Sequence, residues 1–305
     1  MTSGSRRIAV LDAPSNLGLR PPAPLTVPGC YKLAGALRDQ GLLRRLGAED
    51  AGYVVPPRYE RGEWKPGDGV FNAPGIASYS VKLADRVGAL LDGGAFPVVL
   101  GGECSIMLGH ALALARRGRY GVAYLDGHSD FRHLGNSDHV GAAGGEALAL
   151  VTGRGQPDLT DLEGRAPYIR DQDAAVLGIR DDDWSDELRA AGIETWESSR
   201  IRAEGAGAAA DAVTAHLQRD GIEGFWVHLD VDILDPSVMP AVDSPDPGGL
   251  DADEFVTLLA GLVQARGCVG MHVGIFDPDL DPDGTLAARL ADLLVAAIGA
   301  SSAAA

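Results

Sequence analysis

The 305-residue sequence is poor in basic residues, in aromatic residues and in cysteine, and it has no long apolar run. Only 26 Lys and Arg stand against 43 Asp and Glu. The formal net charge of −17 disfavours a sequence-independent grip on nucleic-acid phosphates or on an anionic membrane surface. Aromatic residues make up 6% of the chain, which argues against a surface that stacks bases or sugars. We therefore expect neither a nucleic-acid partner nor a membrane partner.

The scarcity of cysteine and the shortness of the apolar runs also indicate a compartment. Three cysteines are an odd number in a long chain, which is not typical of a secreted disulfide framework. No window approaches the ~18 uninterrupted apolar residues of a membrane-spanning helix. The first apolar run, residues 8–11, is too short for the core of a signal peptide. A cytoplasmic location with reduced thiols is expected.

The sequence is rich in apolar residues that fall into alternating runs. Apolar residues make up 46% of the chain and charged residues 23%, enough hydrophobic material for a sizeable core. Short β-rich runs alternate with longer runs at helical spacing, which is typical of βαβ units around a parallel sheet. The predicted strands are residues 8–11, 97–100, 122–125, 175–177, 225–229 and 271–276. The predicted helices are residues 31–40, 79–91, 105–116, 186–191, 206–219, 252–264 and 285–298.

No break in composition divides these elements. We therefore expect a single α/β domain over residues 1–305, in which residues 301–305 form a frayed tail.

Polar residues follow four of the predicted strands. Leu100 is followed by Gly-Gly-Glu-Cys-Ser and Leu125 by Asp-Gly-His-Ser-Asp. Leu229 is followed by Asp-Val-Asp and Phe276 by Asp-Pro-Asp. Ligands of an open parallel sheet bind beyond the carboxyl ends of its strands. We therefore expect these separated segments to converge on one site.

The acidic members of these motifs predict a metal site. Four carboxylates at one edge would raise one another's pKa unless a positive charge lay among them. Alternate residues of an extended segment point the same way, so Asp-x-His-x-Asp and Asp-x-Asp each place their ligands on one face. Five ligands are too many for one zinc ion, and an oxygen-rich set suits two divalent ions such as Mn²⁺. The candidates are Asp126, His128, Asp130, Asp230 and Asp232.

Together these motifs resemble those of the arginase, agmatinase and formiminoglutamase superfamily of binuclear manganese ureohydrolases. Residues 101–105 are similar to its Gly-Gly-Asp-His-Ser, residues 126–130 to its Asp-Ala-His-x-Asp, and residues 230–236 to its Asp-x-Asp-x-x-Asp-Pro. The resemblance implies a three-layer α/β/α arginase-like fold around a mainly parallel sheet. It also implies a small-molecule substrate and a homo-oligomer, either a trimer or a hexamer.

The resemblance further implies how the ligands are shared between two ions, and which residues catalyse. One ion would be held by Cys104, Asp126, Asp130 and Asp230, and the other by His128, Asp126, Asp230 and Asp232. A hydroxide shared by the ions would attack the planar carbon of the substrate. Asp130 therefore counts as catalytic as well as ligating. His139 is the candidate that protonates the leaving nitrogen, and His133 is a weaker competitor.

The sequence departs from the family at two positions. Cys104 stands where the family has its first histidine ligand, as it does in a hydroxyarginine-hydrolysing branch. A thiolate there remains a competent ligand but favours a softer divalent metal than Mn²⁺. Ile275 stands where members that act on guanidines usually carry a Glu that pairs with the guanidinium. Asp277, on the same side of an extended strand, is the candidate substitute.

Two further positions match places where the family binds its substrate. Arg132 follows the second metal motif where arginases have a small amide that touches the α-carboxylate of the substrate. An arginine there could pair bidentately with a carboxylate. Asp183 lies where family members bind a substrate amine. An amino-acid-like substrate is consistent with both residues.

The sequence therefore predicts a hydrolase that cleaves a C–N bond of a guanidino, hydroxyguanidino or formimino compound. One alternative is a mononuclear zinc hydrolase that resembles deacetylases and shares this fold class. Asp130 and the Asp230-x-Asp232 pair favour two ions and argue against it. The other alternative is a catalytically degenerate homologue that acts as a binding subunit, and the changes at Cys104 and Ile275 are its best support.

Overall fold

The computed structural model describes residues 6–23, 25–60, 64–180 and 184–299. These residues form an eight-stranded sheet in the order β2-β1-β3-β8-β7-β4-β5-β6, and every pairing within it is parallel. The strands are β1 (Ile8–Asp12), β2 (Glu49–Tyr53), β3 (Phe96–Leu100), β4 (Gly121–Leu125), β5 (Ala174–Leu177), β6 (Glu194–Trp196), β7 (Phe225–Asp230) and β8 (Cys268–Gly274). The predicted parallel sheet is confirmed, whereas the predicted tail at 301–305 lies outside the described residues.

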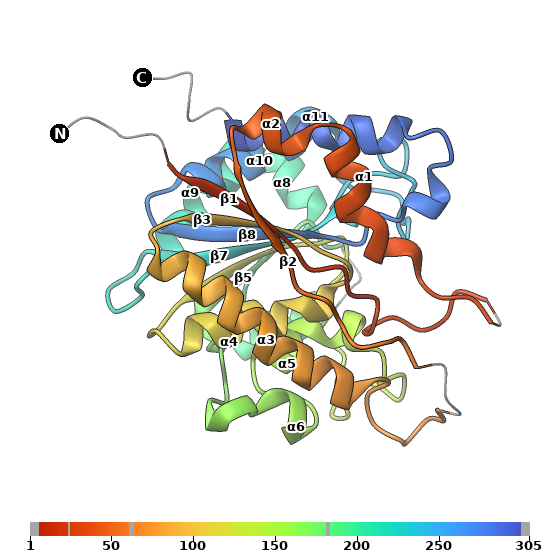
Figure 1. Cartoon of the computed structure of the whole chain (residues 1–305). Helices are drawn as coiled ribbons and strands as arrows, with labels where there is room; N and C mark the ends of the chain where they lie inside the picture. Colours follow the sequence, from red (N-terminus) through yellow and green to blue (C-terminus); the bar gives the residue numbers. More distant parts are fainter. Residues whose placement is uncertain (1–5, 24, 61–63, 181–183, 300–305) are drawn as a thin grey trace.

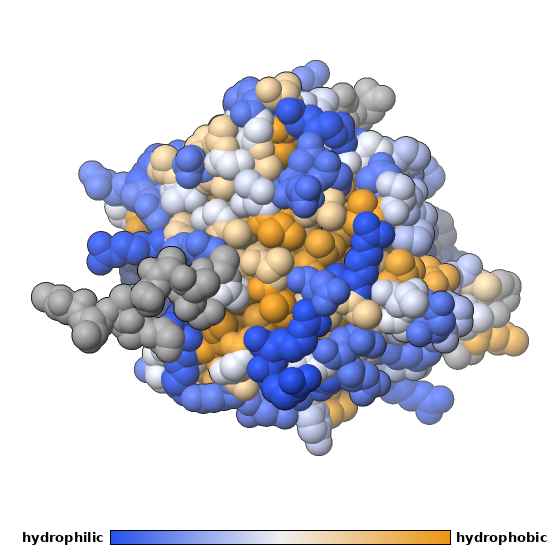
Figure 2. All heavy atoms as spheres, turned by 90° about the horizontal axis from the view of Figure 1, so that it is seen from above, coloured by the Kyte–Doolittle hydropathy of each residue, from blue (hydrophilic) through white to orange (hydrophobic). Residues whose placement is uncertain are grey.

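Helices cover both faces of the sheet (Figure 1), which gives the predicted three layers. One face is covered by α1 (Leu33–Asp39), α2 (Leu42–Leu46), α8 (Ser198–Glu204), α9 (Ala206–Leu217), α10 (Ala252–Gln264) and α11 (Thr285–Gly299). The other is covered by α3 (Ala73–Asp92), α4 (Met107–Ala115), α5 (Ala147–Val151), α6 (Pro157–Thr160) and α7 (Ser185–Ala191). Figure 2 looks onto the first face, where apolar side chains gather toward the middle and polar ones lie around them. No helix of the described residues is long and apolar enough to cross a membrane.

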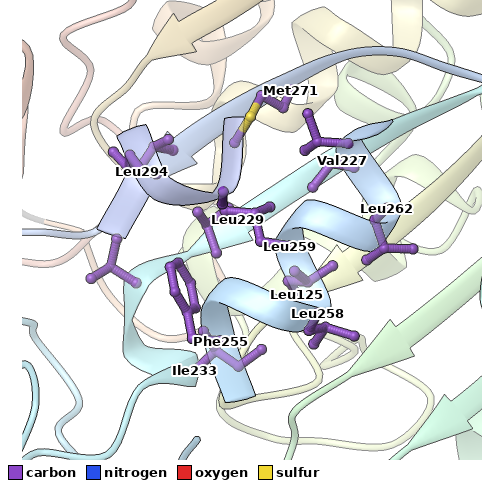
Figure 3. Packing of buried hydrophobic residues seen from close by; sticks show 14 of the residues in the cluster. Leu125, Val227, Leu229, Ile233, Phe255, Leu258, Leu259, Leu262, Met271 and Leu294 are labelled. Atoms are coloured by element: carbon purple, nitrogen blue, oxygen red, sulfur yellow. The ribbon is translucent and has the colours of Figure 1, made fainter. Parts of the chain in front are cut away.

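Burial on both faces explains the continuous apolar sequence of the central strands. β3 and β4 are buried at every residue, as expected for strands of a parallel sheet covered on both sides. On one face, Leu125, Leu229 and Met271 pack against Leu259 of α10 and Leu294 of α11 (Figure 3). Burying each such side chain contributes about 1.5–3 kcal/mol. The core therefore fixes the four central strands, and with them the positions of the loops that follow.

The ends of these central strands are level with one another. β3, β8, β7 and β4 are consecutive in the sheet. Val273 pairs with Leu100 on one side and with Leu229 on the other, and Leu229 pairs with Leu125. The four polar motifs that follow these strands therefore begin at one edge of the sheet, as the sequence predicted.

Two features of the sheet differ from the sequence prediction. The edge strands β2 and β6 were not predicted; they are short, and most residues of β2 are at least partly exposed, so its sequence shows no apolar run. β8 ends at Gly274 instead of continuing to Phe276. Ile275 has a φ of 74°, in the left-handed region. A β-branched residue rarely adopts that conformation, so the prediction of an extended strand through this residue was wrong.

Candidate metal centre and active site

The chain turns sharply after β3 and places Cys104 at the sheet edge. A β-carbon on Gly102 would lie 1.6 Å from the Ser15 carbonyl oxygen, so only glycine fits there. The buried Glu103 carboxylate accepts hydrogen bonds from the hydroxyl of Ser15 and from the backbone amide and hydroxyl of Ser105, each 2.8 Å long. This hydrogen-bonded turn positions the Cys104 thiol, whose Sγ donates to Asp230 Oδ2 at 3.0 Å.

The segment after β4 orients three predicted ligands. Asp126 Oδ1 accepts a hydrogen bond from the His128 backbone amide at 2.6 Å, so the carboxylate folds back over its own turn. Asp130 has a φ of 46°, a left-handed conformation that aspartate tolerates better than most residues. The buried Tyr124 hydroxyl, from within β4, donates to Asp130 Oδ2 at 2.6 Å.

The segment after β7 adds the other two carboxylates. Asp230 Oδ1 accepts a hydrogen bond from the Asp232 backbone amide at 2.8 Å. Asp232 Oδ1 accepts one from the Gly127 amide at 2.8 Å, and its Oδ2 lies 2.7 Å from His128 Nδ1. The loops after β4 and β7 are therefore joined by side chains of the site itself.

These contacts bring all six predicted ligands together. Two groups of ligand atoms result, in each of which the atoms lie within 4.8 Å of one another. The first group is Cys104, Asp126, Asp130 and His228, and the second is Asp126, His128 and Asp232. Asp126 belongs to both groups, and Asp230 lies against Cys104. The arrangement is that of two adjacent cation sites with a shared carboxylate.

His228 was not predicted from the sequence, although a signal for it exists. It lies within β7, two residues before Asp230, and side chains alternate along a strand. His228 and Asp230 therefore point to the same side of the sheet. The signal is a histidine in an otherwise apolar buried strand, because a fully buried imidazole normally has a polar partner.

The protein itself supplies too little positive charge for the carboxylates. Burial, followed by the charges of Asp130, Asp230 and Asp232, raises the pKa of Asp126 well above its usual range. Burial likewise raises the pKa of Asp230, and it raises the pKa of Asp130 to about 7. Burial opposes protonation of His128, but its bond to Asp232 prevails and raises its pKa to about 10. One imidazolium among four buried carboxylates leaves a site that favours bound cations.

An orphaned oxygen supports the same conclusion. Among the described residues, Asp126 Oδ2 is buried without a hydrogen-bond partner. Buried carboxylate oxygens are normally paired, and this one lies 3.4 Å from Nε2 of His228, a member of the first group. The residues present therefore fit a pair of divalent cations.

Five of the six candidate ligands line a cavity of about 860 Å³, namely Cys104, Asp126, His128, Asp130 and Asp230. Arg20, Arg132 and His139 line it, and His139 has an exposed side chain. The Arg132 Nε–H donates to the Gly145 carbonyl oxygen at 3.2 Å. His133, the weaker candidate for proton transfer, has its Nε2 3.2 Å from Glu187 Oε1 instead.

The acidic wall of the cavity contains both a predicted residue and an unpredicted one. Asp277 lines the cavity, but its Oδ2 accepts from the Gly29 amide at 3.0 Å and its Oδ1 from the Asp279 amide at 2.8 Å. Asp243, missed by the sequence analysis, also lines the cavity, and its removal from bulk water raises its pKa to about 6. No motif marked it, because only the fold of the loop after β7 brings it here. Asp183 lies outside the described residues.

A family model described as "Arginase family" matches residues 33–299. The chain belongs to the arginase family. It is therefore a metal-dependent amidinohydrolase that acts on C–N bonds of the guanidino type, and the mononuclear zinc alternative is not favoured.

Its relatives cover nearly the whole chain. It is 28% identical over 282 residues to the arginase of Bacillus caldovelox, covering 90% of this chain and 92% of that one. The solved structure of that arginase has a TM-score of 0.86, with 96% of this chain and 98% of that chain covered. The arginase of Brevibacillus brevis is 29% identical over 226 residues, covering 73% and 75%. The formimidoylglutamase structure from Bacillus subtilis, at 20% identity and a TM-score of 0.74 with 98% and 88% covered, shares the fold.

Proposed function

We propose that this enzyme hydrolyses a small guanidino, hydroxyguanidino or formimino compound that also carries a carboxylate. The observation that carries the proposal is that side chains of both charges line the cavity. Arg20 and Arg132 lie among its lining residues, whereas Asp243 and the carboxylates of the metal centre provide negative charge. A substrate with an anionic end and a cationic, planar reacting end could pair with both kinds of side chain.

Two divalent cations complete the proposed site. One would be held by Cys104 with Asp126, Asp130 and Asp230, and the other by His128 with Asp126, Asp230 and Asp232. When bound, the cations would supply Lewis acidity that lowers the pKa of water and offsets the charge of the carboxylates. The oxygen-rich set suits Mn²⁺, while Cys104 extends the range toward softer divalent metals.

The side chains of the cavity have distinct tasks in the proposed reaction. Tyr124 holds the orientation of Asp130 by its 2.6 Å hydrogen bond. Arg132 would bind the carboxylate of the substrate through its terminal guanidinium nitrogens, because its Nε–H is already used by Gly145. His139, with its exposed ring, would donate the proton that the leaving nitrogen needs when the C–N bond breaks.

Asp243 is the proposed partner of the cationic end of the substrate. Ile275 lines the cavity where guanidine-hydrolysing members carry their Glu, and it offers no charge. Both carboxylate oxygens of Asp277 already accept backbone amides. Asp279, which also lines the cavity, pairs with Lys32. Asp243 is therefore our candidate for that pairing.

The proposal is tested by incubating Mn²⁺-loaded protein with arginine, hydroxyarginine, agmatine, guanidinobutyrate and formiminoglutamate, and by assaying urea, hydroxyurea and formamide. We expect turnover of a carboxylate-bearing member and a weaker response to agmatine, which has no carboxylate. Asp243→Asn should raise KM about tenfold for a cationic substrate. The control Asp279→Asn removes an ion pair with Lys32 at the same rim and should leave KM unchanged.

Two results would separate the alternatives. Two bound metals with no turnover of any compound would contradict the substrate proposal alone. The absence of both metal and turnover would support the degenerate binding subunit. We further propose that the enzyme assembles as a trimer or hexamer, which light scattering on the purified protein would measure directly.

A further inference from the structure

A row of buried aromatic rings leads through the sheet to Asp126 of the candidate metal centre. The Trp226 Nε1–H donates to His272 Nδ1 at 2.9 Å. His272 Nε2 lies 2.7 Å from His228 Nδ1, and His228 Nε2 lies 3.4 Å from Asp126 Oδ2. The side chains of Trp226, His228 and His272 are completely buried. Trp226 and His228 of β7, His272 of β8 and Asp126 directly after β4 thus follow one another in a row.

At the end of this row, two polar atoms without a hydrogen-bond partner in the described part of the chain lie 3.4 Å apart. Among the described residues, His228 Nε2 and Asp126 Oδ2 are both buried with no hydrogen-bond partner. The imidazole of His228 stacks on the Tyr124 ring with centroids 3.7 Å apart, so its plane is fixed. His228 Nε2 therefore either coordinates a cation itself or presents a hydrogen atom to Asp126.

The indole decides between these possibilities, because it is a hydrogen-bond donor only. With Nδ1 accepting from Trp226, a neutral His272 carries its proton on Nε2 and donates to His228 Nδ1. A neutral His228 then carries its own proton on Nε2. Because each ring accepts a hydrogen bond at Nδ1, neither ring can carry a second proton, and both are neutral.

Coordination by His228 Nε2 would need the reverse arrangement. The lone pair would have to lie on Nε2, with the proton of His228 on Nδ1. His272 would then have to accept at Nε2 and carry its proton on Nδ1, directly against the indole N–H of Trp226. Two N–H groups would face each other 2.9 Å apart in a buried site, so this arrangement is strongly disfavoured.

We propose that His228 is a positioning residue that donates its Nε2–H to Asp126 Oδ2, and that Trp226 fixes its tautomer through His272. Asp126 Oδ1 already accepts the His128 amide at 2.6 Å. With His228 on Oδ2, each oxygen has one N–H donor and one lone pair left for a cation. The shared carboxylate is then oriented from behind without added charge.

The inference rests on the metal centre proposed above, but its main test does not require bound metal. Protein labelled with ¹⁵N histidine is studied by NMR, both metal-free and loaded with diamagnetic Zn²⁺ or ¹¹³Cd²⁺. We expect His228 and His272 to be neutral Nε2–H tautomers in every state. A protonated Nδ1 on His228, or a ¹¹³Cd coupling to its Nε2, would overturn the proposal. A protein that binds no metal would contradict the proposed function, yet it would still reveal the tautomer.

Variants test the functional consequence by metal titration. His228→Leu removes the donor and should weaken metal affinity about 10–100-fold, with two metals still bound at saturation. His228→Gln keeps an N–H donor and should restore most of that affinity. If His228→Leu and His228→Gln both bound a single metal, His228 would be a ligand and the proposal would be wrong.

A second matched pair of variants tests whether Trp226 fixes the tautomer of His228. Trp226→Phe keeps an aromatic ring but removes the donor, and it should allow the Nδ1–H tautomer of His228 to appear in the NMR spectrum. Trp196→Phe loses an indole bond to Glu194 at the edge of the sheet, far along the strand order from β7 and β8. It should leave the spectrum of His228 unchanged. An unchanged His228 spectrum in Trp226→Phe would contradict this role of Trp226.

Discussion

In the proposed metal centre, Cys104 would set which cations are preferred. Its Sγ lies 3.0 Å from Asp230 Oδ2, and burial raises the pKa of the thiol well above its usual range. The thiol must therefore lose its proton to a cation before it becomes a ligand. Cation binding at this position would release a proton and would favour metals that bind sulfur well.

Replacing Cys104 by His should shift the preference of the enzyme toward Mn²⁺. Imidazole is a neutral ligand, so no thiol has to ionise and the softer metals lose their advantage. We expect a tighter Mn²⁺ dissociation constant and loss of the sulfur-to-cobalt absorption band in the Co²⁺ form. Cys268→Ser alters another buried thiol, one that contacts Gly270, and serves as the control. Identical Mn²⁺ and Zn²⁺ affinities in Cys104→His and the parent would contradict this role.

The convergence of the six candidate ligands could be predicted from the sequence because each is part of a short motif that directly follows a buried strand. His228 and Asp243 could not be predicted in this way. His228 is recognisable only through the rings around it, and Asp243 only through the path of its loop. Residues that act through packing leave little trace in local sequence.

At the scale of single elements, the loop after β7 depends on one carboxylate. Asp235 Oδ1 accepts the Ser237 amide at 3.0 Å, and its Oδ2 accepts the Gly248 amide at 2.9 Å. It therefore ties the two ends of the segment that carries Asp243. These backbone amides lower the pKa of Asp235 to about 2.

Asp235→Ala should lower the free energy of unfolding by about 1 kcal/mol at pH 7 and raise KM by loosening Asp243. Asp251→Ala is the matched control, because Asp251 also accepts two backbone amides, at the start of α10. It should cost about as much stability but leave KM unchanged. Since the pKa of Asp235 is lowered, its contribution is present above about pH 4 and is lost toward pH 2. The stability difference in urea unfolding should shrink over that range. Equal effects on KM would contradict a special role of the loop.

The elements that were predicted and those that were missed differ in how they are buried. Central strands such as β3 are buried on both faces, so their sequence is continuously apolar and easily recognised. β2 lies at an edge and reads Glu-Asp-Ala-Gly-Tyr, with no apolar pattern. At Ile275 the left-handed backbone is imposed by the surroundings: its amide donates to the Gly102 carbonyl oxygen at 2.7 Å.

At the scale of the whole molecule, the acidic residues behind the formal charge of −17 differ in their effect on stability. Most acidic side chains are solvated or paired with arginine at the surface. The cluster at the sheet edge is buried instead, and without cations it opposes folding when its members ionise.

The metal-free protein should consequently become less stable as pH rises from 5 to 8. The pKa values of Asp126 and Asp230 are raised, so each loses stability as pH rises above its unfolded pKa near ~4. His128, whose pKa is raised to about 10, loses its contribution from ~6.5 upward. The unfolding temperature of EDTA-treated protein should fall by several degrees across this range.

The comparison variant is Asp126→Asn, whose amide does not titrate and should flatten the profile. Asp85→Asn alters an exposed carboxylate that pairs with Arg116 and should leave the profile unchanged. Excess Mn²⁺ should abolish the decline, because the ligands are then ionised in the native state. A metal-free profile with the same slope in Asp126→Asn and the parent would count against the buried charge as its cause.

The strand order has a kinetic consequence as well. β3, β4 and β7 are neighbours or near neighbours at the centre of the sheet, but the chain between Cys104 and Asp232 also builds β5 and β6 and the helices that cover them. Cations bound at the shared carboxylate would thus cross-link the segments that follow β3, β4 and β7, which are separated by a long stretch of chain. Unfolding of these segments would require the cations to dissociate first. The lifetime of the folded enzyme would therefore depend on the rate at which its metals dissociate.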